Sequence, residues 1–337
     1  MSFTVSLKFW SLKETLIFYR NLKGEKEMKG IRGSTEFEKQ FLSNFQRLCN
    51  RHHTWQVWQD FVHMSACAIA NAVDRRPDIW NLREASYLAV VKRYSKDELN
   101  LICELFSITV MALDENPAQD FLGKIYMQLD FGSDWHGQFF TPWNVAELMA
   151  KMQIKDNLKE QIERKDYISI NDPCCGAGCM FLAFAHVCKN DMNINYQQSV
   201  LFVGQDVDEV VAKMCYIQIS LLGCPGYVVV GDTLLEPLCG SAIEPISKKP
   251  ENIWFTPLYF TDLWTLRKIR SWNKDNHKVS EPVPTLKSVE PPKELVKEVT
   301  SEKSMVCKTL QKPVVKKSAD KKKSFSWKEF FTVNGKK

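Results

Sequence analysis

Two glycines and several cysteines follow a short apolar segment near the middle of the chain. Residues 171–184 read NDPCCGAGCMFLAF, with Gly176 and Gly178 on either side of an alanine. Two kinds of chemistry suit such a stretch. The cysteines could hold a metal ion, or the glycines could let the backbone turn tightly against a small ligand, because glycine has no side chain to block the approach. The surrounding sequence favours the second.

The cysteines lack the spacing that a metal centre needs. Cys174 and Cys175 are adjacent, and Cys179 and Cys188 follow at wider intervals. Tetrahedral zinc sites are typically built from cysteine pairs separated by two residues. We therefore predict no metal site here.

The glycine segment lies where a predicted strand turns into a predicted helix. Apolar and β-branched runs predict strands at 166–172, 199–206 and 226–232, and helical periodicity predicts helices at 179–190 and 208–223. Alternating strands and helices of this kind predict βαβ units and a parallel sheet. Ligands of such sheets bind beyond the carboxyl ends of the strands, which is where the glycines fall.

Acidic residues stand at the end of each predicted strand. Asp172 precedes the glycines, Asp206 ends the second strand and Asp232 ends the third. Carboxylates at strand ends can accept hydrogen bonds from the polar groups of a ligand. A dinucleotide fingerprint is excluded, because the third glycine of G-x-G-x-x-G is replaced by Phe181.

Four motifs in sequence order give the chain a family resemblance. They are HGQFFTP (136–142), NDPCCGAGCM (171–180), GQDVD (204–208) and VGDTLLEP (230–237). This set resembles the motifs of adenine-N6 DNA methyltransferases, most closely the modification subunits of type I restriction–modification systems. The resemblance implies an α/β fold, namely a class I S-adenosylmethionine-dependent (Rossmann-like) methyltransferase domain preceded by a helical domain. It also implies S-adenosyl-L-methionine as cofactor, DNA as substrate and a specificity subunit as a candidate partner.

The resemblance assigns roles to the matching residues. The methionine end of the cofactor would lie beside Phe140, Thr141 and Pro142. The cofactor loop would consist of Asp172, Gly176 and Gly178, with Asp206 on the ribose and Asp232 on the adenine.

The family's acceptor motif, (Asn/Asp/Ser)-Pro-Pro-(Phe/Tyr/Trp) at the end of a fourth strand, has no direct counterpart. Its first side chain and a proline carbonyl bind the adenine amine, and its aromatic ring stacks on the flipped base. The nearest match is Thr256-Pro257-Leu258-Tyr259, which departs at the first and third positions. Thr256, Pro257 and Tyr259 are thus the predicted catalytic residues. The alternatives are a catalytically degenerate, cofactor-binding accessory protein of DNA, and a methyltransferase of RNA or protein.

Composition divides the 337 residues into four predicted regions. They are an N-terminal extension (1–33), a helical domain (34–130), the cofactor-binding methyltransferase domain (131–270) and a lysine-rich, disordered tail (271–337). No apolar run reaches the roughly 18 residues of a membrane span, and no signal peptide is recognisable. The 11 cysteines, an odd number, indicate reduced thiols rather than disulfides. We expect a cytoplasmic protein without membrane contact.

The predicted tail carries most of the positive charge. Residues 271–337 hold 16 lysines, no arginine and 8 acidic residues, a net +8, which leaves −3 for residues 1–270 of the chain's +5. Lysines bind DNA phosphates without sequence preference. The tail could therefore add DNA affinity, or it could be solvated and bind nothing.

Deleting residues 274–337 is expected to flatten the salt dependence of DNA binding, because fewer counterions are then released. Fluorescence anisotropy with duplex DNA at several salt concentrations measures the slope of log K against log salt. An unchanged slope would show that the tail does not contact DNA.

Overall fold

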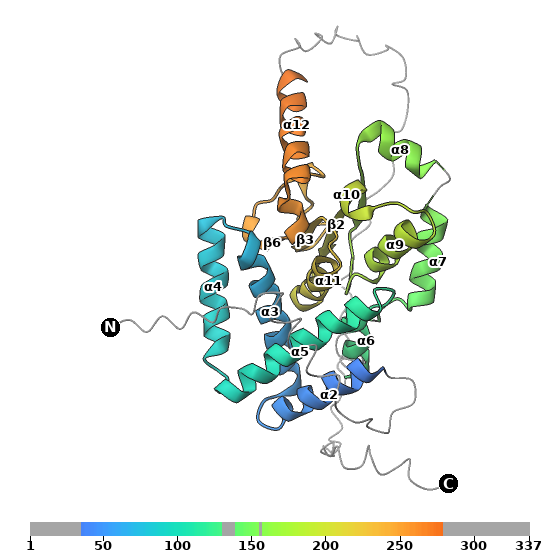
Figure 1. Cartoon of the computed structure of the whole chain (residues 1–337). Helices are drawn as coiled ribbons and strands as arrows, with labels where there is room; N and C mark the ends of the chain where they lie inside the picture. The colour runs from blue at the N-terminus through green and yellow to red at the C-terminus, as the bar shows by residue number, and fades with distance from the viewer. Residues whose placement is uncertain (1–34, 130–138, 155–156, 279–337) are drawn as a thin grey trace, which may run out of the picture. The chain divides into compact units, whose positions relative to one another are not determined.

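The structure, a computed structural model, describes residues 35–129, 139–154 and 157–278. The predicted N-terminal extension, the His136–Gln138 part of the first motif and the tail beyond 278 lie outside the described residues. The described residues belong to one compact unit (Figure 1).

Helices fill the region that the sequence predicted to be helical. They are α2 (Glu36–Cys49), α3 (Thr54–Val73), α4 (Pro77–Val91), α5 (Lys96–Glu115) and α6 (Phe121–Gln128). At the start of α5, Ser95 and Glu98 exchange side-chain and backbone hydrogen bonds in a capping box. None of the helices in the described part of the chain combines the length and apolar character of a membrane span.

Aromatic side chains join these helices. The ring of Phe41 on α2 meets Phe61 of α3 and Phe121 of α6 edge-on, with centroids 5.4 and 5.9 Å apart. Trp58 is fully buried against the same cluster. Edge-to-face pairs of this kind stabilise a fold by more than the burial of their surface area alone. The helical region therefore has a specific core built from its own side chains.

The second half of the described chain alternates strands and helices. It contains α7 (Trp143–Gln153), α8 (Leu158–Lys165), β1 (Ile168–Asp172), α9 (Cys179–Asn190), α10 (Tyr196–Ser199), β2 (Val200–Asp206), α11 (Glu209–Leu221), β3 (Gly226–Val230), β4 (Cys239–Ser241), β5 (Glu244–Ile246), β6 (Ile253–Phe255) and α12 (Asp262–Lys278). Short 3₁₀ turns, η1 (Pro250–Asn252) and η2 (Pro257–Phe260), flank β6. The three predicted strands and the two helices between them are thereby confirmed.

The main sheet has the order β1-β2-β3-β6. The pairs β1–β2 and β2–β3 are parallel, as predicted, so Asp172 and Asp206 emerge at the same edge. The last strand, β6, runs antiparallel to β3. This is the parallel, helix-covered sheet of a Rossmann-like fold, here closed on one side by a reversed strand.

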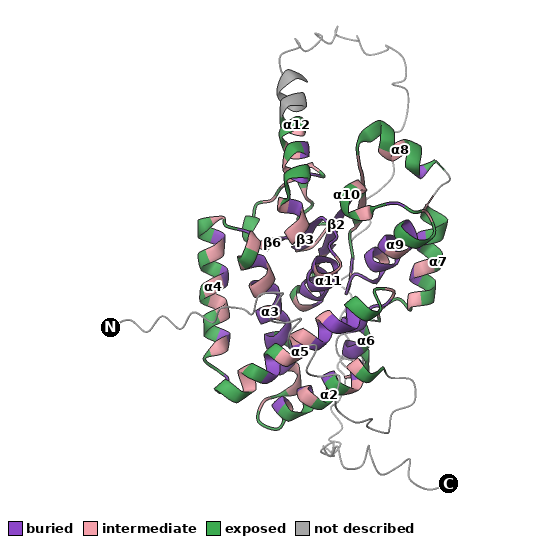
Figure 2. Ribbon diagram, in the orientation of Figure 1, coloured by how far each residue is buried: buried purple, intermediate pink, exposed green. Residues whose placement is uncertain are grey.

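The two faces of the sheet meet different cores. Phe202 and Val228 belong to the large core that also contains the helical region, whereas Leu201 and Tyr227 belong to a smaller cluster that Trp264 of α12 covers. Figure 2 shows buried positions concentrated on α11, α3 and the strands, with exposed positions along α4, α7 and α8. The helical region and one face of the sheet therefore share one hydrophobic core.

One buried amide ties the helical region to the glycine turn. Gln218 on α11 donates from Nε2 to Asp120 Oδ1 and to the carbonyl oxygen of Ala177, both at 2.8 Å. Its Oε1 accepts from the Leu122 N–H at 3.1 Å. Burial raises the pKa of the Asp120 carboxyl, against hydrogen bonds from Gln218 and Gly123 that lower it. Burial at this junction thus disfavours the ionised form of the Asp120 carboxyl.

Substituting Asp120→Asn is expected to remove a pH-dependent loss of stability. Because the folded-state pKa lies above the unfolded value, this carboxyl contributes most to the free energy of unfolding below about pH 4, and the contribution is lost as the pH rises through the folded pKa. Both hydrogen bonds end on Oδ1, which asparagine keeps. In urea unfolding, the free energy of unfolding of the variant relative to that of the parent should therefore increase between about pH 4 and about pH 7. The exposed Asp191→Asn is the control, and equal pH profiles for Asp120→Asn and parent would contradict the account.

Candidate functional site

The turn after β1 needs glycine at two positions. Gly176 and Gly178 have φ of 54° and 93°, a region that other residues rarely adopt. A Cβ on Gly178 would also lie 2.8 Å from Cys215 Sγ on α11. Gly178 then caps α9, whose first N–H groups have no partner within the helix. The turn is compact because both positions lack side chains.

Asp206 holds this turn against the end of β2. Its Oδ2 accepts from the Gly176 N–H at 2.9 Å, and its Oδ1 accepts from the Asp208 N–H at 3.0 Å. The Cys175 N–H donates to the Gln205 carbonyl at 2.9 Å. Each oxygen of the carboxylate still has acceptor capacity for a ligand hydroxyl.

Asp172 lies half-buried at the end of β1. Its Oδ1 accepts from the Cys174 N–H at 3.1 Å. Burial raises the pKa of Asp172, the hydrogen bond from Cys174 lowers it, and the negative charge of Asp206 raises it further. A cation or hydroxyl donor placed between the two carboxylates would relieve this repulsion.

Asp232 shapes the turn after β3. Its Oδ1 accepts from the backbone N–H groups of Leu234 and Leu235, at 2.8 and 3.1 Å. Thr233 Oγ1 donates to the Pro173 carbonyl at 2.7 Å, which joins this turn to the one after β1. The ends of all three parallel strands are therefore hydrogen-bonded into one rim.

Phe140 reaches the same rim from the helical side. A Cβ built on Gly176 would lie 3.5 Å from its ring, and that ring lies 5.0 Å from the Tyr126 ring by centroids. Thr141 and Pro142 are exposed and lead into α7. The structure thus brings Phe140 together with the glycine turn.

Sequence analysis missed three apolar residues at this rim. Val207, directly after Asp206, and Leu234 and Leu235, after Asp232, are all exposed, and Leu234 is 90% exposed. Large apolar side chains gathered around polar strand ends are typical of a small-molecule site. The available signal was an apolar residue within two positions after Asp206 and after Asp232.

Two buried cysteines of α9, Cys179 and Cys188, are held as neutral thiols. Burial raises the pKa of Cys179 and of Cys188 to about 12 in each case. Metal binding needs the thiolate, and in the described ranges no group of three or more side chains is arranged to hold a metal ion.

The predicted catalytic residues lie at the opposite edge of the sheet. Thr256 is fully buried, accepts from the Gly226 N–H at 2.9 Å and donates to the Cys224 carbonyl at 2.7 Å. Gly226 begins β3, and Asp232 follows six residues later, roughly 20 Å along an extended strand. Because β6 is antiparallel, its end points away from the glycine turn.

Tyr259 is also a core residue. Its ring lies 4.5 Å from that of Phe255 by centroids, and its hydroxyl donates to the Ile243 carbonyl at 2.7 Å. Pro257 opens η2 beside it. The prediction that Thr256, Pro257 and Tyr259 bind the acceptor amine is therefore wrong for this geometry.

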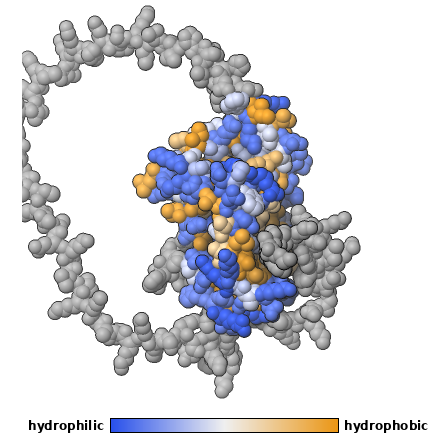
Figure 3. All heavy atoms as spheres, turned by 90° about the vertical axis from the view of Figure 1, so that its left-hand side faces the viewer, coloured by the Kyte–Doolittle hydropathy of each residue, from blue (hydrophilic) through white to orange (hydrophobic). Residues whose placement is uncertain are grey.

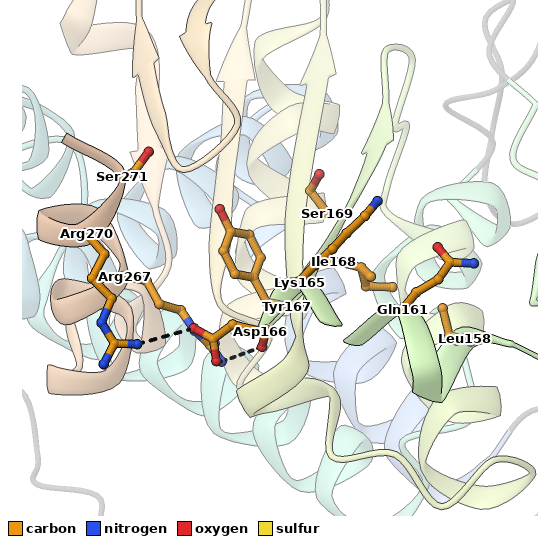
Figure 4. Close-up of a pocket in the computed structure, with 10 residues that line it drawn as sticks. All are labelled: Leu158, Gln161, Lys165, Asp166, Tyr167, Ile168, Ser169, Arg267, Arg270 and Ser271. Atoms are coloured by element: carbon orange, nitrogen blue, oxygen red, sulfur yellow. Dashed lines mark hydrogen bonds and ion pairs between the residues drawn. The ribbon is translucent and has the colours of Figure 1, made fainter. Parts of the chain in front are cut away.

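A cavity lies at the amino-terminal end of β1, between α8 and α12 (Figure 4). It measures about 530 Å³. One of the arginines that line it, Arg267, is already paired, because it donates hydrogen bonds to both carboxylate oxygens of Asp166 at 2.9 Å. Figure 4 shows Tyr167 and Ser169 of the β1 segment between Arg267 and Gln161. Because ligands of parallel sheets bind at the carboxyl edge, this cavity is not the predicted cofactor site.

Comparisons with known proteins agree with the motifs. A model of the N-6 DNA methylase family matches residues 118–287, about half of the chain. Over 158 residues the chain is 25% identical to the type I restriction enzyme MjaVIII methylase subunit of Methanocaldococcus jannaschii. That match covers 45% of this chain and 25% of the relative, so the chain spans about a quarter of the relative's length.

A crystal structure from Listeria monocytogenes, assigned as a class I S-adenosylmethionine-dependent methyltransferase, also matches. Its TM-score is 0.35 at 12% identity, over 60% of this chain and 55% of that one. The fold described here rests on the strand order and directions of the chain itself.

Replacing Thr256 by valine is expected to cost about 1–3 kcal/mol of folding stability, because the Gly226 N–H and the Cys224 carbonyl lose their buried partner. Urea unfolding measures this loss. The affinity for the cofactor should be unchanged, since the candidate cofactor site lies at the opposite edge of the sheet from Thr256. A stable variant with weakened cofactor binding or methyl transfer would restore Thr256 to the functional site.

Proposed function

Because this chain belongs to the N-6 DNA methylase family, we propose that it uses S-adenosyl-L-methionine to methylate adenine N6 in DNA, as a modification subunit that needs a specificity partner. One observation carries the proposal. The glycine turn, Asp206 and Asp232 converge at the carboxyl edge of three parallel strands.

The residues at this edge fit the cofactor in their chemistry. Asp206 offers two carboxylate oxygens to the ribose hydroxyls, and Asp232 accepts from the adenine amine. Val207 and Leu234 would cover the faces of the adenine. The first N–H groups of α9 suit the cofactor's carboxylate. Each part of the ligand thus has a partner of matching chemistry.

The cofactor, when bound, supplies a methyl group on a sulfonium. The chemistry that it would supply is methyl transfer to the adenine amine, with the glycine turn, Asp206 and Asp232 holding the cofactor in place. Phe140 would exclude water beside the glycine turn, since its ring lies 3.5 Å from where a Cβ of residue 176 would be. Asp172 would accept a hydrogen bond from a hydroxyl or ammonium group of the ligand, and an ammonium group there would offset the burial and the Asp206 charge that raise its pKa.

A type I methylase subunit among the relatives supports DNA as the substrate and a specificity subunit as the partner. The second candidate function is a cofactor-binding accessory protein that does not transfer methyl groups. The observation in its favour is the position of Thr256 and Tyr259, buried at the wrong edge of the sheet. In that case the cofactor would bind to the chain without turnover.

Transfer of radiolabelled methyl from the cofactor to mixed-sequence duplex DNA separates the two functions. The full chain is assayed alone and with each candidate specificity subunit, and the product is identified by chromatography of nucleosides. N6-methyladenine is the expected product. Cofactor binding without transfer under every condition would establish the accessory function instead.

Asp206→Ala is expected to weaken cofactor binding by about 1.5–3 kcal/mol, because a carboxylate that serves two hydroxyls is lost. This corresponds to a roughly 10- to 150-fold rise in Kd by titration calorimetry. Asp191→Ala removes an exposed carboxylate just beyond α9 and should bind as the parent does. Equal affinity of Asp206→Ala and parent would refute the ribose assignment.

A further inference from the structure

A second cavity, of about 290 Å³, lies between the sheet and the segment that leads into the β4–β5 hairpin. Its floor contains Asn171 of β1, Gln205 of β2 and Tyr227 of β3, and residues 237–242 form its roof. We propose that this cavity, here called the hairpin cavity, binds a nucleobase that bears an exocyclic amine, namely adenine or cytosine. The inference goes beyond the proposed function, because the cavity lies on a face of the sheet and binding there needs no methyl transfer.

Three strands turn side chains toward the hairpin cavity. In the sheet register Asn171 lies opposite Val203, and Val203 lies opposite Tyr227. Gln205 is two positions beyond Val203 and projects from the same face, because side chains alternate along a strand. Val203 and Tyr227 belong to the smaller core, whereas Asn171 is exposed. The cavity therefore begins where polar side chains replace the apolar ones of that core.

Two buried tyrosines fix the roof of the cavity. The Tyr227 hydroxyl donates to the Ala242 carbonyl at 2.8 Å, and the Tyr259 hydroxyl donates to the Ile243 carbonyl at 2.7 Å. Ile243 is itself buried in the smaller core. The roof is therefore held over the sheet before any ligand arrives, so less ordering entropy opposes binding.

Gln205 supplies an unpaired acceptor to this cavity. The residue is 4% exposed, and its Nε2 donates to the carbonyl oxygens of Gly231 and Glu236 at 3.2 and 3.3 Å. These two carbonyls require the NH₂ end of the amide on their side, so Oε1 is the end that remains for a ligand. No residue that the structure describes donates a hydrogen bond to Oε1. A ligand N–H would form a strong bond there, because the surrounding protein lowers the local dielectric constant.

The remaining groups define the class of ligand. In the described part of the chain the Asn171 amide forms no hydrogen bond, so both its donor and its acceptor are open to a ligand. An asparagine amide pairs with the amine and a ring nitrogen of adenine, and cytosine also presents an amine beside a ring acceptor. The Gln205 oxygen would accept the second amine proton. Uracil and thymine lack this amine and should bind poorly.

The hairpin cavity does not suit the cofactor. Among the described residues that line it, none carries a charged side chain, whereas S-adenosyl-L-methionine has a sulfonium, an ammonium and a carboxylate group. The cavity is also at the lower end of the roughly 300–1,000 Å³ of small-molecule pockets. One uncharged heterocycle fits, with Val203 and Leu238 as apolar walls.

The two sites are neighbours. Pro173 and Thr233 line the hairpin cavity, and the hydrogen bond between them is part of the rim at the carboxyl edge. A base in the cavity would therefore lie next to the cofactor without occupying its place, and we expect the two ligands to bind together.

Saturation-transfer NMR titration of the full chain with adenine, cytosine and uracil tests the proposal. S-adenosylhomocysteine is present at saturation, so that the adenine position of the cofactor is filled. Adenine and cytosine are expected to bind, and uracil to bind about tenfold more weakly or less, because the amine is worth about as much as a specific base contact.

Asn171→Leu removes the amide and keeps a side chain of similar size. It should raise the Kd for adenine about tenfold or more and leave the Kd for S-adenosylhomocysteine unchanged. Asn81→Leu on α4 is the matched control, an exposed asparagine far along the chain, and should bind adenine as the parent does. Figure 3 shows the α4 side of the chain, where hydrophilic residues predominate.

Oligonucleotides distinguish two sources of the base, a free base or nucleoside and an unstacked base of a single strand. Oligodeoxyadenylate and oligothymidylate are compared at one salt concentration. A base taken from a strand would make the parent prefer the adenine strand, and Asn171→Leu would lose that preference. A site for the free base would bind adenosine as it binds adenine, and the two strands would bind equally.

Equal binding of adenine by Asn171→Leu and parent would overturn the proposal, and so would displacement of adenine by S-adenosylhomocysteine. Ser169→Phe fills the cavity from β1 and provides a second variant that should abolish adenine binding if Asn171→Leu does not fold. Failure of S-adenosylhomocysteine to bind the parent would instead refute the proposed function. The comparison of Asn171→Leu with Asn81→Leu would still decide the hairpin cavity.

Discussion

The hydrogen bond from the Gly176 N–H to the Asp206 carboxylate joins the ends of β1 and β2, and the candidate site depends on it. It forms because Gly176 adopts a positive φ, which turns its N–H toward the second strand. The parallel register then brings the end of β3 alongside, and Thr233 connects it back to the first turn. A rim of turns linked in this way is rigid before any ligand arrives, so less ordering entropy opposes binding.

The helical region contributes to that rigidity through a buried amide. Gln218 reaches both Asp120 and the carbonyl oxygen of Ala177, inside the glycine turn. A buried amide with all of these partners fixes its neighbours, and loss of one would leave another unsatisfied. Because the helices and one face of the sheet share a core, a change in the helical packing is transmitted to the rim.

Sequence reasoning predicted the parts of the fold that local patterns determine. The glycine turn, the three parallel strands and the aspartates at their ends follow from turn chemistry and apolar runs, which are properties of adjacent residues. The direction of β6 could not be predicted, because Ile-Trp-Phe is equally apolar in either direction and the connection through β4 and β5 decides its orientation. For the same reason Thr256 and Tyr259 were assigned to the wrong edge.

Hydrogen exchange of the full chain with and without the product analogue S-adenosylhomocysteine is the most direct test of the central claim, that the carboxyl edge of β1, β2 and β3 binds the cofactor. Slower exchange is predicted in the turns at 173–178, 206–208 and 231–235, because the ligand would cover their N–H groups. The cavity between α8 and α12 should be unaffected. Protection confined to that cavity, or no protection at a saturating concentration, would contradict the account.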